Sequence, residues 1–163
     1  STVKIAQKGF PIAYAIIGGE YRRFKGLIDY YKAIGRNAGY SEDKLKVASH
    51  SWGFIADTDE EAINKYFHPT KQVVDAISKD RPFWSPLTFE QYLNSVGPEG
   101  SMLVGSPETV ANKLIDMIET LNLDRFLLHL PLGSMPHEDI MKSIKLFGEE
   151  VAPKVRAHFN KSK

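Results

Sequence analysis

Apolar residues along this chain form continuous runs that fit strands and spaced stripes that fit helices. A helix-like segment from Thr2 to Gln7 opens the sequence. The run from Phe10 to Ile17 is continuously apolar and ends at Gly18 and Gly19, which is typical of a strand buried on both faces in a parallel sheet. Beyond it, apolar side chains recur at offsets of three and four, and this spacing predicts an amphipathic helix ending near Gly39. The apolar positions of that helix are Phe24, Leu27, Ile28, Tyr31 and Ile34.

The same alternation of strand and helix continues after residue 44. A weaker strand is predicted from Leu45 to Phe54, although its centre is polar. Thr58 and Glu61 have the spacing of a capping box and begin a helical stripe. We expect the His68–Pro69 step to bend or interrupt this helix and the Arg81–Pro82 step to end it.

The last third of the chain contains two further units. The aromatic stretch from Phe83 to Leu87 predicts an ordered loop before a short helix, and a short extended piece follows at Ser101–Val104. The segment from Ser106 to Glu108 has the cap, proline and acidic residue of a helix start. The last strand is predicted from Arg125 to Leu130, and Pro153 is expected near the end of the final helix.

This order of elements predicts an α/β protein in which right-handed crossovers join parallel strands. Three or four strands are too few to close a barrel of about eight strands. The sheet should therefore have an exposed edge unless another part or protein covers it. We expect one domain from residue 1 to 159, followed by a disordered tail from 160 to 163.

Composition narrows the classes of function. The chain has 163 residues, of which 42% are hydrophobic and 25% charged, as in a soluble globular domain. Its net charge of +1 gives no support for binding nucleic acid or a membrane surface. The lack of cysteine excludes disulfides, thiolate metal sites and cysteine nucleophiles, and is compatible with the cytoplasm. Neither a membrane span nor a signal peptide is recognisable in the sequence.

Seven segments are informative through their order and spacing, and they are Ala15–Gly19, His50–Ser51, Phe54–Ala62, Gly105–Ala111, Arg125–Leu128, Pro136–Glu138 and Phe147–Pro153. Individually these segments are weak signals, but together they extend over almost the whole chain. In this arrangement they resemble the C-terminal half of the bacterial luciferase-like flavin monooxygenases. The resemblance implies a partial TIM-type (β/α)8 barrel made of its C-terminal strand-helix units and a late insertion. Because the sequence begins at Ser1 inside a helix-like segment, we expect a processed chain or an internal piece.

The resemblance also implies a chemistry. Such enzymes use reduced FMN and O2 to oxidise a small organic substrate, and members that use a deazaflavin are the nearest alternative. A flavin reductase is a partner that the resemblance allows. The family's catalytic histidine and most flavin contacts belong to earlier strands, upstream of Ser1, so no catalytic residue is assigned here. Ser1 and Thr2 resemble the end of the family's phosphate-binding turn, where a helix N-terminus suits a phosphate.

Further candidate site residues follow from the barrel geometry that the resemblance implies, because loops at the C-terminal ends of barrel strands build the active site. Gly18 and Gly19 could let a cofactor approach the backbone closely, or could simply form a tight turn. His50 and Ser51 are expected at a strand end and predict a substrate pocket, with a hydrogen-bonded structural histidine as the alternative. His129 and Gly133 are candidates for the same pocket, although a core histidine explains His129 as well.

Two other groups of residues have structural explanations. The acidic residues from Asp57 to Glu61 lie at a predicted helix start, and no metal site is predicted because no HExxH or EF-hand spacing occurs. Trp52, Phe83 and Trp84 could line a pocket or serve as core or interface anchors, and we expect a homo-oligomer with Phe83 and Trp84 at its interface. A rival hypothesis is a half-barrel that no longer catalyses and acts as a binding or assembly module. Its sheet edge would then be covered by a second copy or another protein.

Overall fold

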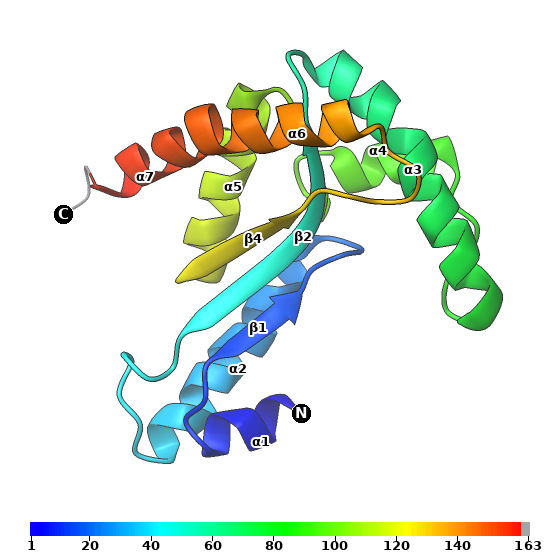
Figure 1. Cartoon of the computed structure of the whole chain (residues 1–163). Helices are drawn as coiled ribbons and strands as arrows, with labels where there is room; N and C mark the ends of the chain where they lie inside the picture. Colours follow the sequence, from blue (N-terminus) through cyan, green and yellow to red (C-terminus); the bar gives the residue numbers. More distant parts are fainter. Residues whose placement is uncertain (161–163) are drawn as a thin grey trace.

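The computed structural model describes residues 1–160 and contains a parallel sheet with helices packed on one of its faces (Figure 1). The strands are β1 (Ile12–Ala15), β2 (Val47–Ile55), β3 (Leu103–Gly105) and β4 (Arg125–His129). The helices are α1 (Thr2–Gln7), α2 (Phe24–Asn37), α3 (Asp59–Asp80), α4 (Phe89–Val96), α5 (Pro107–Leu121), α6 (His137–Leu146) and α7 (Ala152–Asn160). A 3-10 turn, Tyr21–Arg23, precedes α2, and a π-helical segment, Phe147–Val151, joins α6 to α7.

β2 is the central strand, and every strand pairing in the sheet is parallel. Ala48, Ser49 and His50 pair with β1 and also with β4, so these two strands lie on opposite edges of β2. β3 pairs farther along, with Gly53 to Ile55. Because a helix follows each strand, the predicted α/β class with parallel strand-helix units is confirmed.

One face of the sheet is covered by helices. Tyr14 of β1 and Val47 of β2 are buried there with residues of α2, α5 and α7, among them Tyr31, Met117 and Val155. Figure 1 shows α2 and α5 behind the strands, where they pack on this face. The largest buried core of the chain therefore lies between the sheet and these helices.

A second buried cluster lies where β2 ends. Phe54 stacks on Tyr66 of α3 with ring centroids 5.5 Å apart, and Trp52, Tyr92 and Leu132 belong to the same cluster. This cluster fastens α3, α4 and the loop after β4 to the C-terminal end of β2. Within residues 1–160, no helix is both long and apolar enough to cross a membrane.

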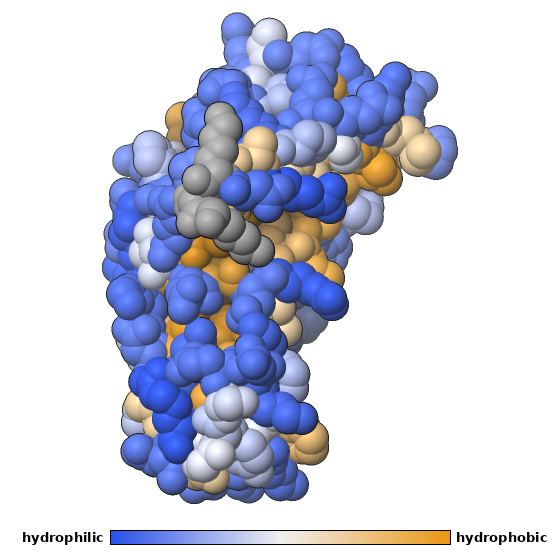
Figure 2. All heavy atoms as spheres, turned by 90° about the vertical axis from the view of Figure 1, so that its left-hand side faces the viewer, coloured by the Kyte–Doolittle hydropathy of each residue, from blue (hydrophilic) through white to orange (hydrophobic). Residues whose placement is uncertain are grey.

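The opposite face of the sheet is open. On β1, Ala13 and Ala15 are exposed while Tyr14 between them is buried, so the expectation of a strand buried on both faces is wrong. On β4, Leu127 is 48% exposed although it is a large apolar residue. Seen from the left of Figure 1, apolar surface gathers in a hollow between the hydrophilic ends of the molecule (Figure 2).

Two prolines do not act as the sequence suggested. The predicted break at Pro69 is wrong, because α3 runs without interruption from Asp59 to Asp80. Pro69 deprives the carbonyl of Lys65 of its helical donor, yet the residues on both sides of it remain helical. Pro153 lies just after the π-helical segment Phe147–Val151, and the helix continues through it to Asn160.

The last helix extends further than the sequence predicts. Helix α7 includes Asn160, the first residue of the predicted disordered tail. The rest of that predicted tail, 161–163, lies outside the described residues.

Lys113 holds the α4 region to α5. Its ammonium group donates to the carbonyls of Val96, Gly97 and Met102 at 3.0, 2.6 and 2.6 Å. These carbonyls lie at the end of α4 and just before β3, where helical partners are lacking. Burial lowers the pKa of Lys113 to about 8. The unfolded chain therefore binds more protons than the folded chain between this pKa and the ordinary lysine pKa of 10.5, so the contribution of Lys113 to stability rises with pH in this window.

The two faces of β4 give the first prediction. Leu128 packs in the covered core, whereas its neighbour Leu127 is on the open face. We expect Leu128→Ala to lower the free energy of unfolding by about 2–4 kcal/mol and Leu127→Ala by less than about 1 kcal/mol. Urea denaturation followed by circular dichroism measures both. Equal losses would contradict the assignment of an open face.

The Lys113 anchor gives the second prediction. Lys113→Met leaves the three carbonyls without their donor, and we expect the free energy of unfolding to fall by about 2–4 kcal/mol at neutral pH. The gap between the wild type and this variant should widen as the pH rises from about 8 to 10.5. Lys25→Met, at a lysine that forms only a surface pair with Asp29, is the control and should change stability by about 0.5 kcal/mol at most. A Lys113→Met protein as stable as the wild type would refute the anchor.

Candidate functional site

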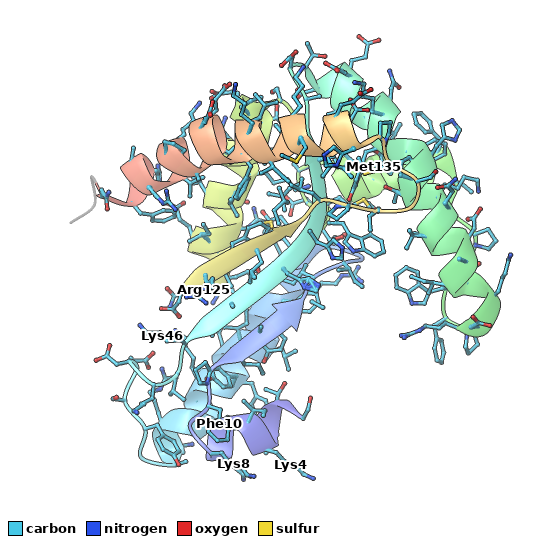
Figure 3. The ribbon with its side chains drawn as sticks, viewed as in Figure 1. Lys4, Lys8, Phe10, Lys46, Arg125 and Met135 are labelled. Carbon is cyan, nitrogen blue, oxygen red and sulfur yellow. The ribbon has the colours of Figure 1, made fainter. Side chains whose placement is uncertain are left out.

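The open face of the sheet presents one set of alternate residues from adjacent parallel strands. Successive side chains on a strand point to opposite faces, so residues two apart share a face. The side chains on the open face come from β1, β2 and β4, and they are Ala13, Ala15, Ala48, His50, Arg125, Leu127 and His129. Arg125 lies at the start of β4 (Figure 3), and Trp52, on the same side of β2 beyond His50, is buried in the second cluster. The centre of this face is therefore a floor of small residues with imidazole groups beside it.

His50 and His129 lie close together on this floor. In the register of β2 and β4, His50 is opposite Leu127 and Trp52 is opposite His129, which makes the histidines diagonal neighbours. Their ring centroids are 6.2 Å apart and the rings are inclined by 59°. The structure thus brings together two predicted site residues that are far apart in the sequence.

The two histidines line a cavity of about 550 Å³. Its other walls are apolar and come from β4, the loop after it and α6, namely Leu127, Leu128, Leu130, Pro131, Ile140 and Ile144. Each imidazole can donate or accept a hydrogen bond at a ring nitrogen. The cavity can therefore hold a mostly apolar molecule and bind one or two of its polar atoms.

The structure separates Ser51 from the histidine cavity, although the sequence predicts it in the same pocket as His50. His50 is in the middle of β2, which continues to Ile55, so the predicted strand end at this point is wrong. Ser51 points away from the cavity: it is fully buried and its hydroxyl has no hydrogen-bond partner. Strand alternation explains the separation, because neighbours in a strand cannot share a face.

Gly133 serves to dock the loop after β4 on α3. Its φ of +51° suits glycine, and a Cβ there would lie 2.7 Å from the carbonyl oxygen of Pro69. The next residue, Ser134, donates from its amide and its hydroxyl to Oε1 of Gln72 at 3.0 and 2.9 Å. Gly133 is therefore close to α3 and does not line the histidine cavity.

Gly18 and Gly19 follow the C-terminal end of β1 and are exposed. The amide of Ile16 still donates to the carbonyl of His50 at 2.9 Å, and the backbone leaves the sheet beyond it. A Cβ at either glycine would meet nothing within 4 Å, and Gly19 has a φ of +70°. The backbone of this turn is thus accessible to a ligand, while only Gly19 needs glycine for its conformation.

The other predicted cofactor residues begin α1. Ser1 is exposed and makes no side-chain cap, and the hydroxyl of Thr2 lies 3.3 Å from that of Tyr14 on β1. Thr2 thus already has a partner within the protein. Contact of Ser1 and Thr2 with a phosphate stays a prediction.

The acidic residues from Asp57 to Glu61 have protein partners. Asp57 pairs with Lys142 of α6, and Asp59 accepts hydrogen bonds from the backbone of Ser106 and the hydroxyl of Thr109. Among residues 1–160, no three His, Asp or Glu side chains are grouped to hold a metal ion. This cluster joins α3 to α5 and α6.

The aromatic candidates divide among core and surface. Trp52 is buried in the second cluster, Trp84 is partly buried against it, and Phe83 is 98% exposed. Ile140 and Ile144 lie four residues apart on α6, so they share one face of the helix, and both line the histidine cavity. This spacing is visible in the sequence, but it does not show that the facing surface is a cavity.

The fold of this chain is similar to part of several solved structures. No protein-family model matches the chain, and no curated protein matches it either. Among solved structures, a monooxygenase from Streptomyces bottropensis has 17% identity and a TM-score of 0.76, and the match covers 94% of this chain but 44% of that one.

Two further structures match over similar parts of their chains. The oxygenating constituent of 3,6-diketocamphane monooxygenase from Pseudomonas putida, in complex with FMN, has 21% identity and a TM-score of 0.61, over 95% of this chain and 45% of that one. The coenzyme F420-dependent tetrahydromethanopterin reductase from Methanopyrus kandleri has 19% identity and a TM-score of 0.60, over 94% and 48%. This chain thus spans less than half the length of each of these proteins. The resemblance found in the sequence is confirmed at the level of the fold, and the chain has the fold of part of a luciferase-like (β/α) barrel.

Proposed function

We propose that this chain forms part of the cofactor and substrate site of a flavin-dependent oxidoreductase, a monooxygenase that uses reduced FMN and O2 to oxidise a small organic substrate. The observation that carries the proposal is the open face of β1, β2 and β4, with two histidines beside a floor of small residues. Solved structures with the same fold include one in complex with FMN. In a barrel, the strand face that is open here would face the interior.

The open face fits a planar flavin. Ala13, Ala15 and Ala48 leave room for a flat ring system, and the exposed Gly18–Gly19 turn lets a ligand approach the backbone at the end of β1. The phosphate contact at Ser1, at the N-terminus of α1, is part of the proposal, whereas the hydroxyl of Thr2 is directed to Tyr14 on the covered face of the sheet. A bound flavin would supply the redox chemistry with oxygen, while this chain would position the flavin and exclude water.

The histidine cavity is our candidate for the substrate pocket. His50 and His129 would bind a polar atom of the substrate, and Leu130, Ile140 and Ile144 would contact its apolar part. These contacts favour a small, mainly apolar substrate with an oxygen or nitrogen atom that can hydrogen-bond to imidazole. No catalytic role is assigned to either histidine.

The open face also needs a cover. β1 and β4 each pair only with β2 among the described residues, so each has a free edge. We propose that further barrel strands, from a longer chain or from a second copy, pair with these edges and enclose the site. This proposal rests on the chain spanning 44% of the Streptomyces monooxygenase.

Two alternatives have support. A deazaflavin could occupy the same face, because one protein with this fold depends on coenzyme F420. A non-catalytic half-barrel that binds a partner through its free edges is consistent with the open sheet itself. Binding of a flavin would favour the enzyme over the non-catalytic half-barrel. A competing titration with a deazaflavin would show which of the two cofactors binds more tightly.

Flavin binding is the third prediction. Titration of FMN with the purified chain should give saturable quenching of flavin fluorescence. Ala48→Phe places a ring on the small-residue floor, so we expect it to weaken binding at least about tenfold by steric exclusion. Ala76→Phe is the matched control, because Ala76 is exposed on α3 and lies away from the floor.

The outcomes of this titration are distinct. Weakened binding in Ala48→Phe and normal binding in Ala76→Phe would locate the flavin on the open face. Equal affinity of all three proteins would contradict the location. A wild-type chain that fails to quench FMN would contradict the prediction that this chain alone binds the flavin.

Self-association is the fourth prediction. Phe83 is 98% exposed in the loop between α3 and α4, so a large apolar side chain is left in contact with water. If Phe83 anchors a homo-oligomer, Phe83→Ser should lower the mass measured by light scattering. Phe10→Ser is the control, at a phenylalanine that is 55% exposed in the segment before β1. An unchanged mass for Phe83→Ser would count against the interface.

A further inference from the structure

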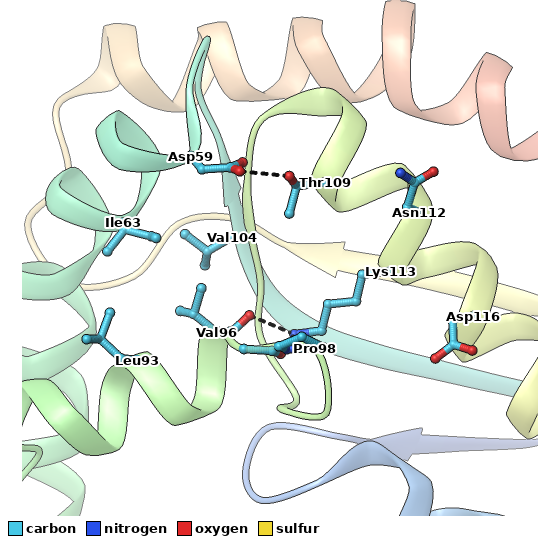
Figure 4. Close-up of a pocket in the computed structure, with 11 residues that line it drawn as sticks. Asp59, Ile63, Leu93, Val96, Pro98, Val104, Thr109, Asn112, Lys113 and Asp116 are labelled. Carbon is cyan, nitrogen blue, oxygen red and sulfur yellow. Dashed lines mark hydrogen bonds between the residues drawn. The ribbon is translucent and has the colours of Figure 1, made fainter.

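A second cavity lies among the helices, between α3 and α4 on one side and α5 on the other (Figure 4). It has a volume of about 580 Å³ and shares no lining residue with the histidine cavity. Ligand sites in proteins commonly have volumes of about 300–1,000 Å³. Its size therefore suits a small organic molecule.

One side of this cavity is apolar. Ile63 comes from α3, Leu93 and Val96 from α4, and Val104 from β3, with Pro98 beside them. Leu93 remains 41% exposed although it is a large apolar residue. A ligand with an apolar body would remove this surface from water, which is favourable by about 25 cal/mol per Å² of apolar area.

The other side carries polar groups, and most of their charge is already matched. The ammonium group of Lys113 is turned onto backbone carbonyls, so its methylene chain is what lines the cavity (Figure 4). Asp116 pairs with Arg22 at 2.7 Å and accepts a hydrogen bond from the hydroxyl of Tyr21. Neither residue offers a free charge to a ligand.

Asp59 is different, because its negative charge has no cationic partner. Its carboxylate accepts hydrogen bonds from the amide of Ser106 at 2.6 Å and from the hydroxyl of Thr109 at 2.9 Å. Those donors hold the pKa of Asp59 below its usual value, so the carboxylate is ionised at neutral pH. In the part of the chain that the structure describes, no lysine, arginine or histidine lies within 4.0 Å of it.

We propose that this cavity binds a small amphipathic amine, with its cation on Asp59 and its apolar body against Leu93, Val96 and Val104. The charge selects the class of ligand: an ionised carboxylate at the edge of an apolar cavity attracts an alkyl- or arylalkylammonium ion and repels a carboxylic acid. The site is independent of the proposed flavin site.

The test compares two ligands of nearly equal shape, phenylbutylamine and phenylbutanol, at neutral pH. Binding is followed by amide chemical shifts in two-dimensional NMR spectra of the full chain. We expect the amine to bind about tenfold more tightly than the alcohol, because a hydrogen bond to a charged group contributes about 1.5–3 kcal/mol. The shifted amides should be those of α3, α4 and α5.

Two variants locate the charge and the apolar wall. Asp59→Asn should remove the preference for the amine, while Asp29→Asn, on the exposed surface of α2, should keep it. Leu93→Ser should weaken both ligands at least about threefold, whereas Leu27→Ser should not, although Leu27 has nearly the same exposure, 39% against 41%. Leu93→Ser leaves the Asp59 hydrogen bonds intact, so it tests the site even if Asp59→Asn perturbs the fold.

Several results would overturn the proposal. Equal affinity for the amine and the alcohol in the wild type would show that Asp59 selects nothing. The absence of a saturable shift at millimolar amine would show that the cavity is not a ligand site. Shifts confined to the open face of the sheet would place the amine in the histidine cavity instead. These measurements do not involve FMN. Failure of the amine proposal and failure of the proposed function are therefore distinguishable.

Discussion

The alternation of side chains along β2 is the constraint on which the rest of the structure depends. Val47, Ser49 and Ser51 face the helices, so Ala48 and His50 must face the other way. The parallel register with β4 then places His129 beside His50. A shift of one residue in this register would bury the histidines and expose the core residues. The site and the core are therefore specified by the same strand pairing.

Most of the fold could be predicted from the sequence, because its signals are local. The cap at Thr58, the helix start at Ser106 and the apolar run near Tyr14 each depend on neighbouring residues, and each marks an element of the structure. The order of these elements then implied a parallel sheet. The run near Tyr14 could not reveal an open face, since a strand inside a barrel and a strand in a buried sheet have the same apolar pattern.

The site could be predicted only in part, because it depends on contacts between distant segments. His50 and His129 were identified as candidates, but their proximity follows from the register of β2 and β4. Ser51 was assigned to the pocket on account of its position next to His50, although that adjacency places it on the opposite face. The anchor at Lys113 was missed altogether, since a single lysine in a helix shows nothing of the carbonyls around it.

The central claim is that the open face of β1, β2 and β4 is a ligand-binding surface, and histidine side chains report on it directly. The measurement is the NMR spectrum of the imidazole ring protons, recorded with and without FMN. We predict that FMN shifts or broadens the signals of His50 and His129 and leaves those of His68 and His158, on exposed helices, unchanged. If His68 or His158 responded while His50 and His129 did not, the account of the open face would be wrong.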